Sequence, residues 1–179
     1  MRRIPLNSMS LTRSLCVFLA IAAACYMAPS QAAKFKINNK PPSGVMLSIG
    51  PGGARIGEVA FKIKARDLGN GVALRGKPDM NITVANRATP GNSRVAVLSV
   101  DSSIPLRNGS HTAPFTSISW VARDNNIPSG RYDGSSNQFL FSFANSQQVK
   151  DKHQFFYDNT GILEVGTYTG RVTYTLTMP

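Results

Sequence analysis

The sequence lacks the residue patterns on which most enzymes and metal-binding proteins depend. Among its 179 residues are two histidines, His111 and His153, and neither stands in a metal-ligand spacing such as H-E-x-x-H. There is no G-x-S-x-G, P-loop or G-x-G-x-x-G motif, and the nine acidic residues are scattered along the chain. We therefore expect no catalytic residue, no cofactor and no metal ligand, and we expect that the protein is not an enzyme.

One acidic loop is the exception to this scarcity. Residues 124–126, together with Asp133, carry the oxygen ligands that Ca²⁺ prefers. The loop lacks the register of an EF-hand, however, and Pro128 interrupts it. We interpret it as a turn held by hydrogen bonds.

Long apolar runs are also lacking, except near the N-terminus. Residues 15–27 are apolar throughout, and they follow a segment that contains Arg2, Arg3 and Arg13 but no acid. Small residues, Ser30 and Ala32, then stand at positions −3 and −1 of a cleavage site. This pattern predicts a secretory signal peptide at residues 1–32, because the run is too short for a membrane span.

Three alternatives remain open at this end of the chain. Cleavage after Ala33 is the alternative site, and Met9 is an alternative start, because the residues after it already form a basic head. Lipid attachment at Cys25 is the third, although no leucine stands three residues before it. Both cysteines, Cys16 and Cys25, leave with the signal, so the mature chain of 147 residues has no disulfide and is long enough for one domain.

Negative charge is scarce in the mature chain. Loss of three arginines leaves seventeen basic residues against nine acids, a net charge of +8. Such a charge favours anionic polysaccharides or lipid headgroups as partners. No run of Lys or Arg and no interleaved aromatics mark a nucleic-acid site, so we expect no nucleic-acid partner and interpret the charge as a solvated basic surface.

Strand patterns fill the rest of the sequence, and no segment predicts a helix. Short stretches rich in β-branched and aromatic residues recur at spacings of about eight to twelve residues, which predicts an all-β sandwich over residues 41–179. Glu58 to Lys64 alternates cleanly, with Val59, Phe61 and Ile63 expected to point inward. The predicted strands are 44–49, 58–64, 72–74, 81–85, 94–100, 115–121, 138–143, 153–157 and 165–178.

The closing strand has the clearest alternation. One face is mostly aromatic and aliphatic, and the other is mostly threonine, which predicts one buried and one solvated face. The first face consists of Tyr168, Gly170, Val172, Tyr174, Leu176 and Met178. No other segment of the chain is an obvious partner for that face.

Three segments in this order resemble a known family. They are the closing strand at residues 165–178, the early segment Pro-Ser-Gly-Val-Met-Leu-Ser-Ile at 42–49, and Phe-Thr-Ser-Ile-Ser-Trp at 115–120. Together they resemble alpha-class chaperone–usher fimbrial subunits, the colonisation-factor-antigen type of pilin. The resemblance spans most of residues 41–178, and the absence of cysteine agrees with it.

The resemblance implies an incomplete immunoglobulin-like β-sandwich. In such subunits a missing strand leaves an apolar groove, which the N-terminal segment of a neighbouring subunit fills by main-chain pairing. The implied partners are neighbouring subunits, a periplasmic chaperone and an outer-membrane usher, and the implied location is a surface fimbria that supports adhesion or biofilm formation. Tyr168, Val172, Tyr174 and Leu176 are the residues expected to line the groove. The alternative is that they fill a closed core.

The N-terminal arm, residues 33–40, is the candidate donor strand. It offers two alternate apolar side chains, Phe35 and Ile37, whereas a donor strand of this family is expected to present about five over ~30 Å. This difference suggests a tip, initiating or minor subunit.

A free-standing secreted β-sandwich that binds carbohydrate or a cell surface through its loops is the alternative function. Tyr132, in the Gly-Arg-Tyr-Asp-Gly segment at 130–134, is the candidate for stacking on a sugar. We expect Trp120 and the alternating Phe139, Phe141 and Phe143 to lie in the core instead.

Overall fold

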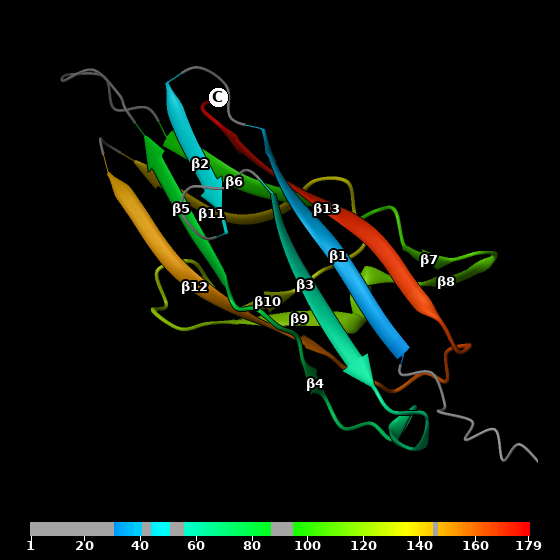
Figure 1. Cartoon of the computed structure of the whole chain (residues 1–179). Helices are drawn as coiled ribbons and strands as arrows, with labels where there is room; N and C mark the ends of the chain where they lie inside the picture. Colours follow the sequence, from blue (N-terminus) through cyan, green and yellow to red (C-terminus); the bar gives the residue numbers. More distant parts are fainter. Residues whose placement is uncertain (1–30, 41–43, 51–55, 87–94, 145–146) are drawn as a thin grey trace, which may run out of the picture.

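The computed structural model describes residues 31–40, 44–50, 56–86, 95–144 and 147–179. In these residues the chain forms two β-sheets, A and B, that pack against each other as two layers (Figure 1). Helical structure in this part of the chain is confined to two single 3₁₀ turns, Ala65–Asp67 and Phe115–Ser117. No helix in the described ranges is long and apolar enough to cross a membrane. The predicted signal peptide lies outside them, apart from Gln31 and Ala32.

Sheet A contains the first and the last described strands next to each other. Its strands lie in the order β11-β6-β13-β1-β3, and a small hairpin of β7 and β8 extends from β13. The bounds are β11 (Gln138–Ala144), β6 (Val95–Asp101), β13 (Thr167–Thr177), β1 (Gln31–Lys40), β3 (Ile56–Ile63), β7 (Leu106–Asn108) and β8 (His111–Ala113).

Sheet B forms the opposite layer. Its strands lie in the order β10-β9-β12-β5-β2, and the short β4 pairs with the end of β12. The bounds are β10 (Gly130–Arg131), β9 (Ile118–Ala122), β12 (Gln148–Tyr157), β5 (Met80–Asn86), β2 (Val45–Ile49) and β4 (Leu74–Arg75).

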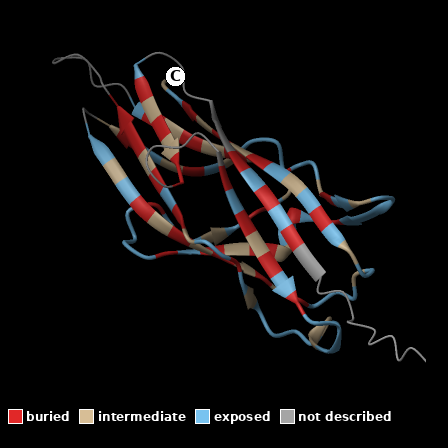
Figure 2. Ribbon diagram, viewed as in Figure 1, coloured by how far each residue is buried: buried red, intermediate tan, exposed pale blue. Residues whose placement is uncertain are grey.

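The core lies between the two sheets, and burial alternates along the strands (Figure 2). Val59, Phe61 and Ile63 of β3 are buried, as their alternation predicted. The same period of two gives β2 the pattern of buried Val45, Leu47 and Ile49. The prediction of an all-β, sandwich-like domain is therefore confirmed.

The prediction that Phe139, Phe141 and Phe143 all point into the core is wrong. Phe143 is buried, Phe141 is partly buried, and Phe139 is 62% exposed. The pairing of β11 with β6 shifts register between Phe139 and Phe141, which marks a β-bulge. Because a bulge inserts one extra residue, the inward positions become Leu140 and Phe143, three residues apart.

The loop after β9 is held by a buried carboxylate. Asp151 of β12 accepts hydrogen bonds from the backbone amides of Asp124, Asn126 and Ile127, at 3.2, 2.8 and 2.8 Å. Burial tends to raise the pKa of Asp151, but these amides outweigh it and hold the pKa below its ordinary value. The oxygens of Asp151 thus bind backbone amides, which agrees with the interpretation of this loop as a hydrogen-bonded turn.

His153 of β12 lies in the core without polar partners. It is fully buried and stacks on Trp120, with ring centroids 6.0 Å apart and an interplanar angle of 12°. Neither ring nitrogen has a hydrogen-bond partner among the described residues. Burial lowers the pKa of His153 to about 4, against a smaller opposing effect of the Asp151 charge.

His153 should make the domain sensitive to mild acid. Below pH 6.5 the imidazole of His153 is protonated in the unfolded state but stays neutral in the folded state, because its folded pKa is about 4. The free energy of unfolding should therefore fall as the pH is lowered from 6.5 to about 4, by at most ~1.4 kcal/mol per pH unit. We expect His153→Phe to reduce this slope in urea unfolding measured from pH 7 to 4.5. The matched control is His111→Phe, which removes an exposed imidazole outside the core. Equal slopes in all three proteins would contradict the assignment.

Candidate functional site

The closing strand β13 places all four of its predicted lining residues in the interior. Tyr168, Val172, Tyr174 and Leu176 are each 2% exposed or less. The outward threonines between them are exposed or partly exposed. The inward and outward faces predicted from the alternation of this strand are thus confirmed.

The N-terminal arm lies directly beside this strand. β1 comprises this arm and the two residues before it, and it pairs with β13 in parallel from Ala32–Thr167 to Lys40–Thr175 and with β3 in antiparallel from Gln31–Ile63 to Asn38–Ile56. Every other strand pair in the described residues is antiparallel. Figure 1 shows β1 between β13 and β3, and residues 32–38 are paired on both sides. The partner for β13 that was not evident from the sequence is therefore supplied within the chain.

Among residues 33–37, the part of β1 whose side chains the structure describes, three side chains face inward rather than the two expected. Ala33 is buried in addition to Phe35 and Ile37, while Lys34 and Lys36 are exposed. The predicted cleavage after Ala32 would leave all three buried residues in the mature chain. Phe35 and Ile37 each contribute about 1.5–3 kcal/mol by leaving water.

Phe35 occupies the centre of an aromatic cluster. Its ring makes edge contacts with Phe115, Tyr132 and Phe155, with centroids 5.7, 6.2 and 5.1 Å away. It also stacks on Phe61 of the neighbouring β3 at 6.3 Å. Edge-to-face pairs of this kind stabilise beyond the area that they bury. A single residue of β1 thus contacts rings from both sheets.

Two glycines stand beside the large side chains of β1. Gly170 of β13 is the register partner of Phe35, and Gly57 of β3 is the partner of Ile37. A Cβ at Gly170 would lie 2.8 Å from Leu106 Cδ2 and 3.1 Å from the Leu106 Cα. The glycine therefore lets the backbone at Leu106 approach the sheet closely, which is a common reason for glycine inside a strand.

Tyr132 does not lie on an exposed loop. It is 1% exposed, and its hydroxyl lies 3.1 Å from the hydroxyl of Tyr174, in the same cluster as Phe35. Burial raises the pKa of both phenols well above the ordinary value, so both are neutral. Tyr132 is therefore not available to stack on a sugar, and the prediction of a ligand-binding role for it fails because its ring fills the core.

The structure divides the predicted lining residues into two groups. Tyr168, Val172 and Tyr174 are register partners of residues in β1, whereas Leu176 lies beyond the end of that pairing and pairs with Leu98 of β6. The strand on the other side of β1, which is β3, was not recognised from the sequence as a partner of the arm. Its alternation gave the inward residues, but no local signal indicates which strand pairs with β1.

Comparisons with known proteins do not assign the chain to a family. A scan against models of protein families finds no match to the chain, and a search of curated proteins finds no significant relative. Within the described residues there is also no group of three or more His, Cys, Asp or Glu side chains that is arranged to hold a metal ion.

Phe35→Ala should destabilise the domain strongly, by about 3–5 kcal/mol, because it leaves a cavity among four aromatic rings. Lys36→Ala, one residue away on the exposed face of the same strand, should change stability by less than about 0.5 kcal/mol. Urea unfolding of the mature protein measures both. Similar losses for the two variants would show that β1 is not inserted with this face inward.

Proposed function

We propose that the protein is a structural subunit of a surface fimbria, assembled by the chaperone–usher route through donor-strand complementation. The fold is then an immunoglobulin-like sandwich in which one strand of sheet A is exchangeable. Neighbouring subunits, a periplasmic chaperone and an outer-membrane usher are its partners. The protein supports adhesion or biofilm formation, as a minor or terminal subunit because its donor strand is short.

The observation that carries this proposal is the position of β1. The strand order β13-β1-β3 means that β1 alone joins β3 to the rest of sheet A within the described residues. Strands in a sheet lie about 4.8 Å apart, so removal of β1 would leave β13 and β3 separated by about 9.6 Å. That gap is a groove one strand wide.

The groove without β1 would have the properties of a strand acceptor. Its walls offer unpaired backbone groups of β13 and β3, and its floor consists of apolar rings, among them Phe115 and Phe155. An exposed edge of this kind promotes aggregation, which is the reason for an assembly chaperone to cover it. Tyr168, Val172 and Tyr174 are the residues of the predicted lining set that would contact an incoming strand.

The place of β1 in the chain also favours exchange. Under the predicted cleavage after Ala32, residues 33–40 begin the mature chain, so β1 is attached to the sandwich through one end. A strand attached in this way can be withdrawn and replaced without threading the chain through a loop. Main-chain pairing on both sides then gives affinity, and the pockets for Phe35 and Ile37 give register.

A second function is favoured by the same strand. In the structure β1 fills the groove of its own chain, which gives a domain with a closed core. A free-standing secreted β-sandwich that binds carbohydrate or a cell surface would have this closed form. The two functions differ in whether β1 pairs with β13 of its own copy or of another.

Photo-cross-linking distinguishes these functions. A photoreactive amino acid at Lys36, on the exposed face of β1, would cross-link to the strands on either side of it, whether β1 lies parallel or antiparallel to β13. Filaments sheared from cells that produce copies labelled with ¹⁴N and ¹⁵N should give cross-linked peptides that join position 36 of one copy to β13 or β3 of another. The same label at Lys150 of β12, on the other sheet, is the matched control and should give no cross-link to β13 or β3.

Two outcomes would contradict the fimbrial proposal. One is the absence of surface filaments that contain the protein. The other is that all cross-links from position 36 fall within single copies even when filaments form.

A further inference from the structure

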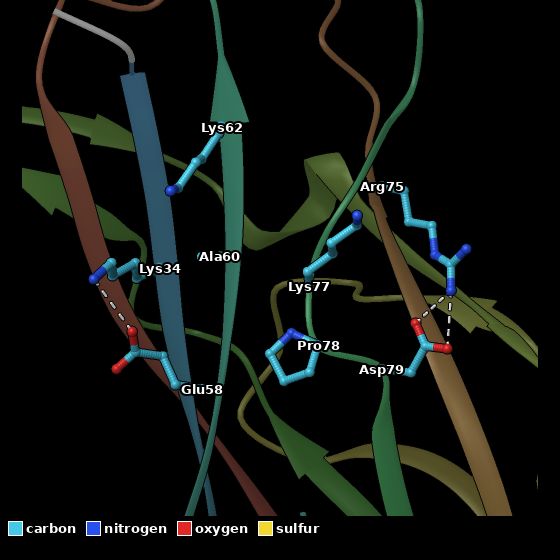
Figure 3. Close-up of a pocket in the computed structure, with 8 residues that line it drawn as sticks. All are labelled: Lys34, Glu58, Ala60, Lys62, Arg75, Lys77, Pro78 and Asp79. Atoms are coloured by element: carbon cyan, nitrogen blue, oxygen red, sulfur yellow. Dashed lines mark hydrogen bonds and ion pairs between the residues drawn. The ribbon is translucent and has the colours of Figure 1, made fainter.

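An open cleft of about 950 Å³ lies over the edge of sheet A where β3 approaches β4 (Figure 3). Its floor includes Ala60 of β3, the smallest side chain on the exposed face of that strand. Backbone hydrogen bonds of 2.8 and 2.9 Å join Ala60 to Lys77, which fixes the segment after β4 against β3. The lining residues are Lys34, Glu58, Ala60, Lys62, Arg75, Lys77, Pro78 and Asp79.

The two carboxylates of the cleft already have basic partners. Glu58 lies 3.4 Å from Lys34, and Asp79 accepts hydrogen bonds from Arg75 at 2.7 and 2.9 Å. Gln154 donates a further hydrogen bond to Asp79 at 3.2 Å, and Lys152 lies 3.9 Å away. These contacts leave Asp79 ionised and fixed on one side of the cleft.

Two lysines remain without partners. Lys62 and Lys77 are exposed and make no ion pair with any described residue. Figure 3 shows them on the two sides of Ala60, one from β3 and one from the segment after β4. With four basic groups against two carboxylates, the cleft has a net charge of +2. It is therefore an open cleft in which two lysines that form no ion pair with a described residue can bind an anion.

The chemistry of the cleft fits an acidic oligosaccharide. Ammonium groups suit sulfate or carboxylate groups, and the carboxylates of Glu58 and Asp79 can accept hydrogen bonds from sugar hydroxyls. The lining has no aromatic ring on which a nucleic-acid base would stack and no large exposed aliphatic side chain that would enter a membrane. Its volume lies within the range of small-ligand sites.

We infer that this cleft binds an acidic polysaccharide segment, with Lys62 and Lys77 holding its sulfate or carboxylate groups above Ala60. Both lysines and Ala60 lie outside β1, but Lys34 of β1 also lines the cleft and pairs with Glu58, so the inference applies to the domain with β1 in place. Lys34 and Lys36 continue the basic surface along β1, so a longer chain can extend from the cleft across sheet A.

Calorimetric titration of the mature protein tests the site. The probes are a heparin hexasaccharide and a polygalacturonate hexasaccharide, with a neutral chitin hexasaccharide as the ligand control, at about 50 mM NaCl where screening is weak. We expect at least one acidic probe to bind and the neutral probe not to bind. The stronger acidic probe then shows whether sulfate or carboxylate is preferred.

Matched variants distinguish binding in this cleft from the general electrostatic attraction of an acidic probe to a basic protein. K62Q/K77Q should weaken binding about tenfold, whereas R123Q/K150Q, which removes the same charge from exposed positions around sheet B, should weaken it less than about twofold. Ala60→Met fills the floor without changing charge and should also weaken binding while the melting temperature is kept. Equal losses in the two double variants, full affinity in K62Q/K77Q, or no binding of either acidic probe would overturn the inference.

Discussion

The insertion of β1 between β13 and β3 is the constraint on which the rest of the structure depends. Sheet A is continuous across that position because β1 satisfies backbone groups on both sides. The core is continuous there because Phe35 contacts rings from both sheets. One short segment thus completes both the hydrogen bonding of one layer and the packing between two layers.

The parallel pairing of β1 with β13 distinguishes this strand from its neighbours. Parallel pairs are slightly less stable per residue than antiparallel pairs, and they cannot form through a tight hairpin. The affinity of β1 for its site therefore depends to a large extent on the burial of Phe35 and Ile37. The proposed exchange of this strand therefore requires an incoming segment with the same spacing of apolar side chains.

Local sequence patterns predicted those properties that depend on a single strand, such as which of its side chains face inward. The alternation of β13 gave its inward residues, and that of β3 gave Val59, Phe61 and Ile63, because side-chain direction follows from a period of two. Phe139 was misplaced because a bulge changes the period within β11, and no sequence signal marks it. Tyr132 was misplaced because its glycine-rich surroundings indicate a loop, although tertiary packing against Tyr174 buries its ring.

The candidate sites depend on long-range pairing, which the sequence does not encode locally. Phe35 and Ile37 were recognised as the apolar positions of the arm, but their place beside Gly170 and Gly57 follows from register between distant strands. The same holds for Lys62 and Lys77, which are fifteen positions apart in the sequence and line the same cleft because Ala60 pairs with Lys77. The composition indicated a basic surface but not where its charges gather.

Native-state hydrogen exchange tests the central claim most directly, namely that β1 can leave the sandwich while the other strands stay paired. The amides of residues 34–37 in β1 should exchange through a partial opening whose free energy is clearly below that of global unfolding and depends little on denaturant. The amides of β12 in sheet B should exchange through global unfolding. If the amides of β1 and β12 share one opening free energy and one denaturant dependence, β1 is a permanent part of the core and the account of an exchangeable strand is wrong.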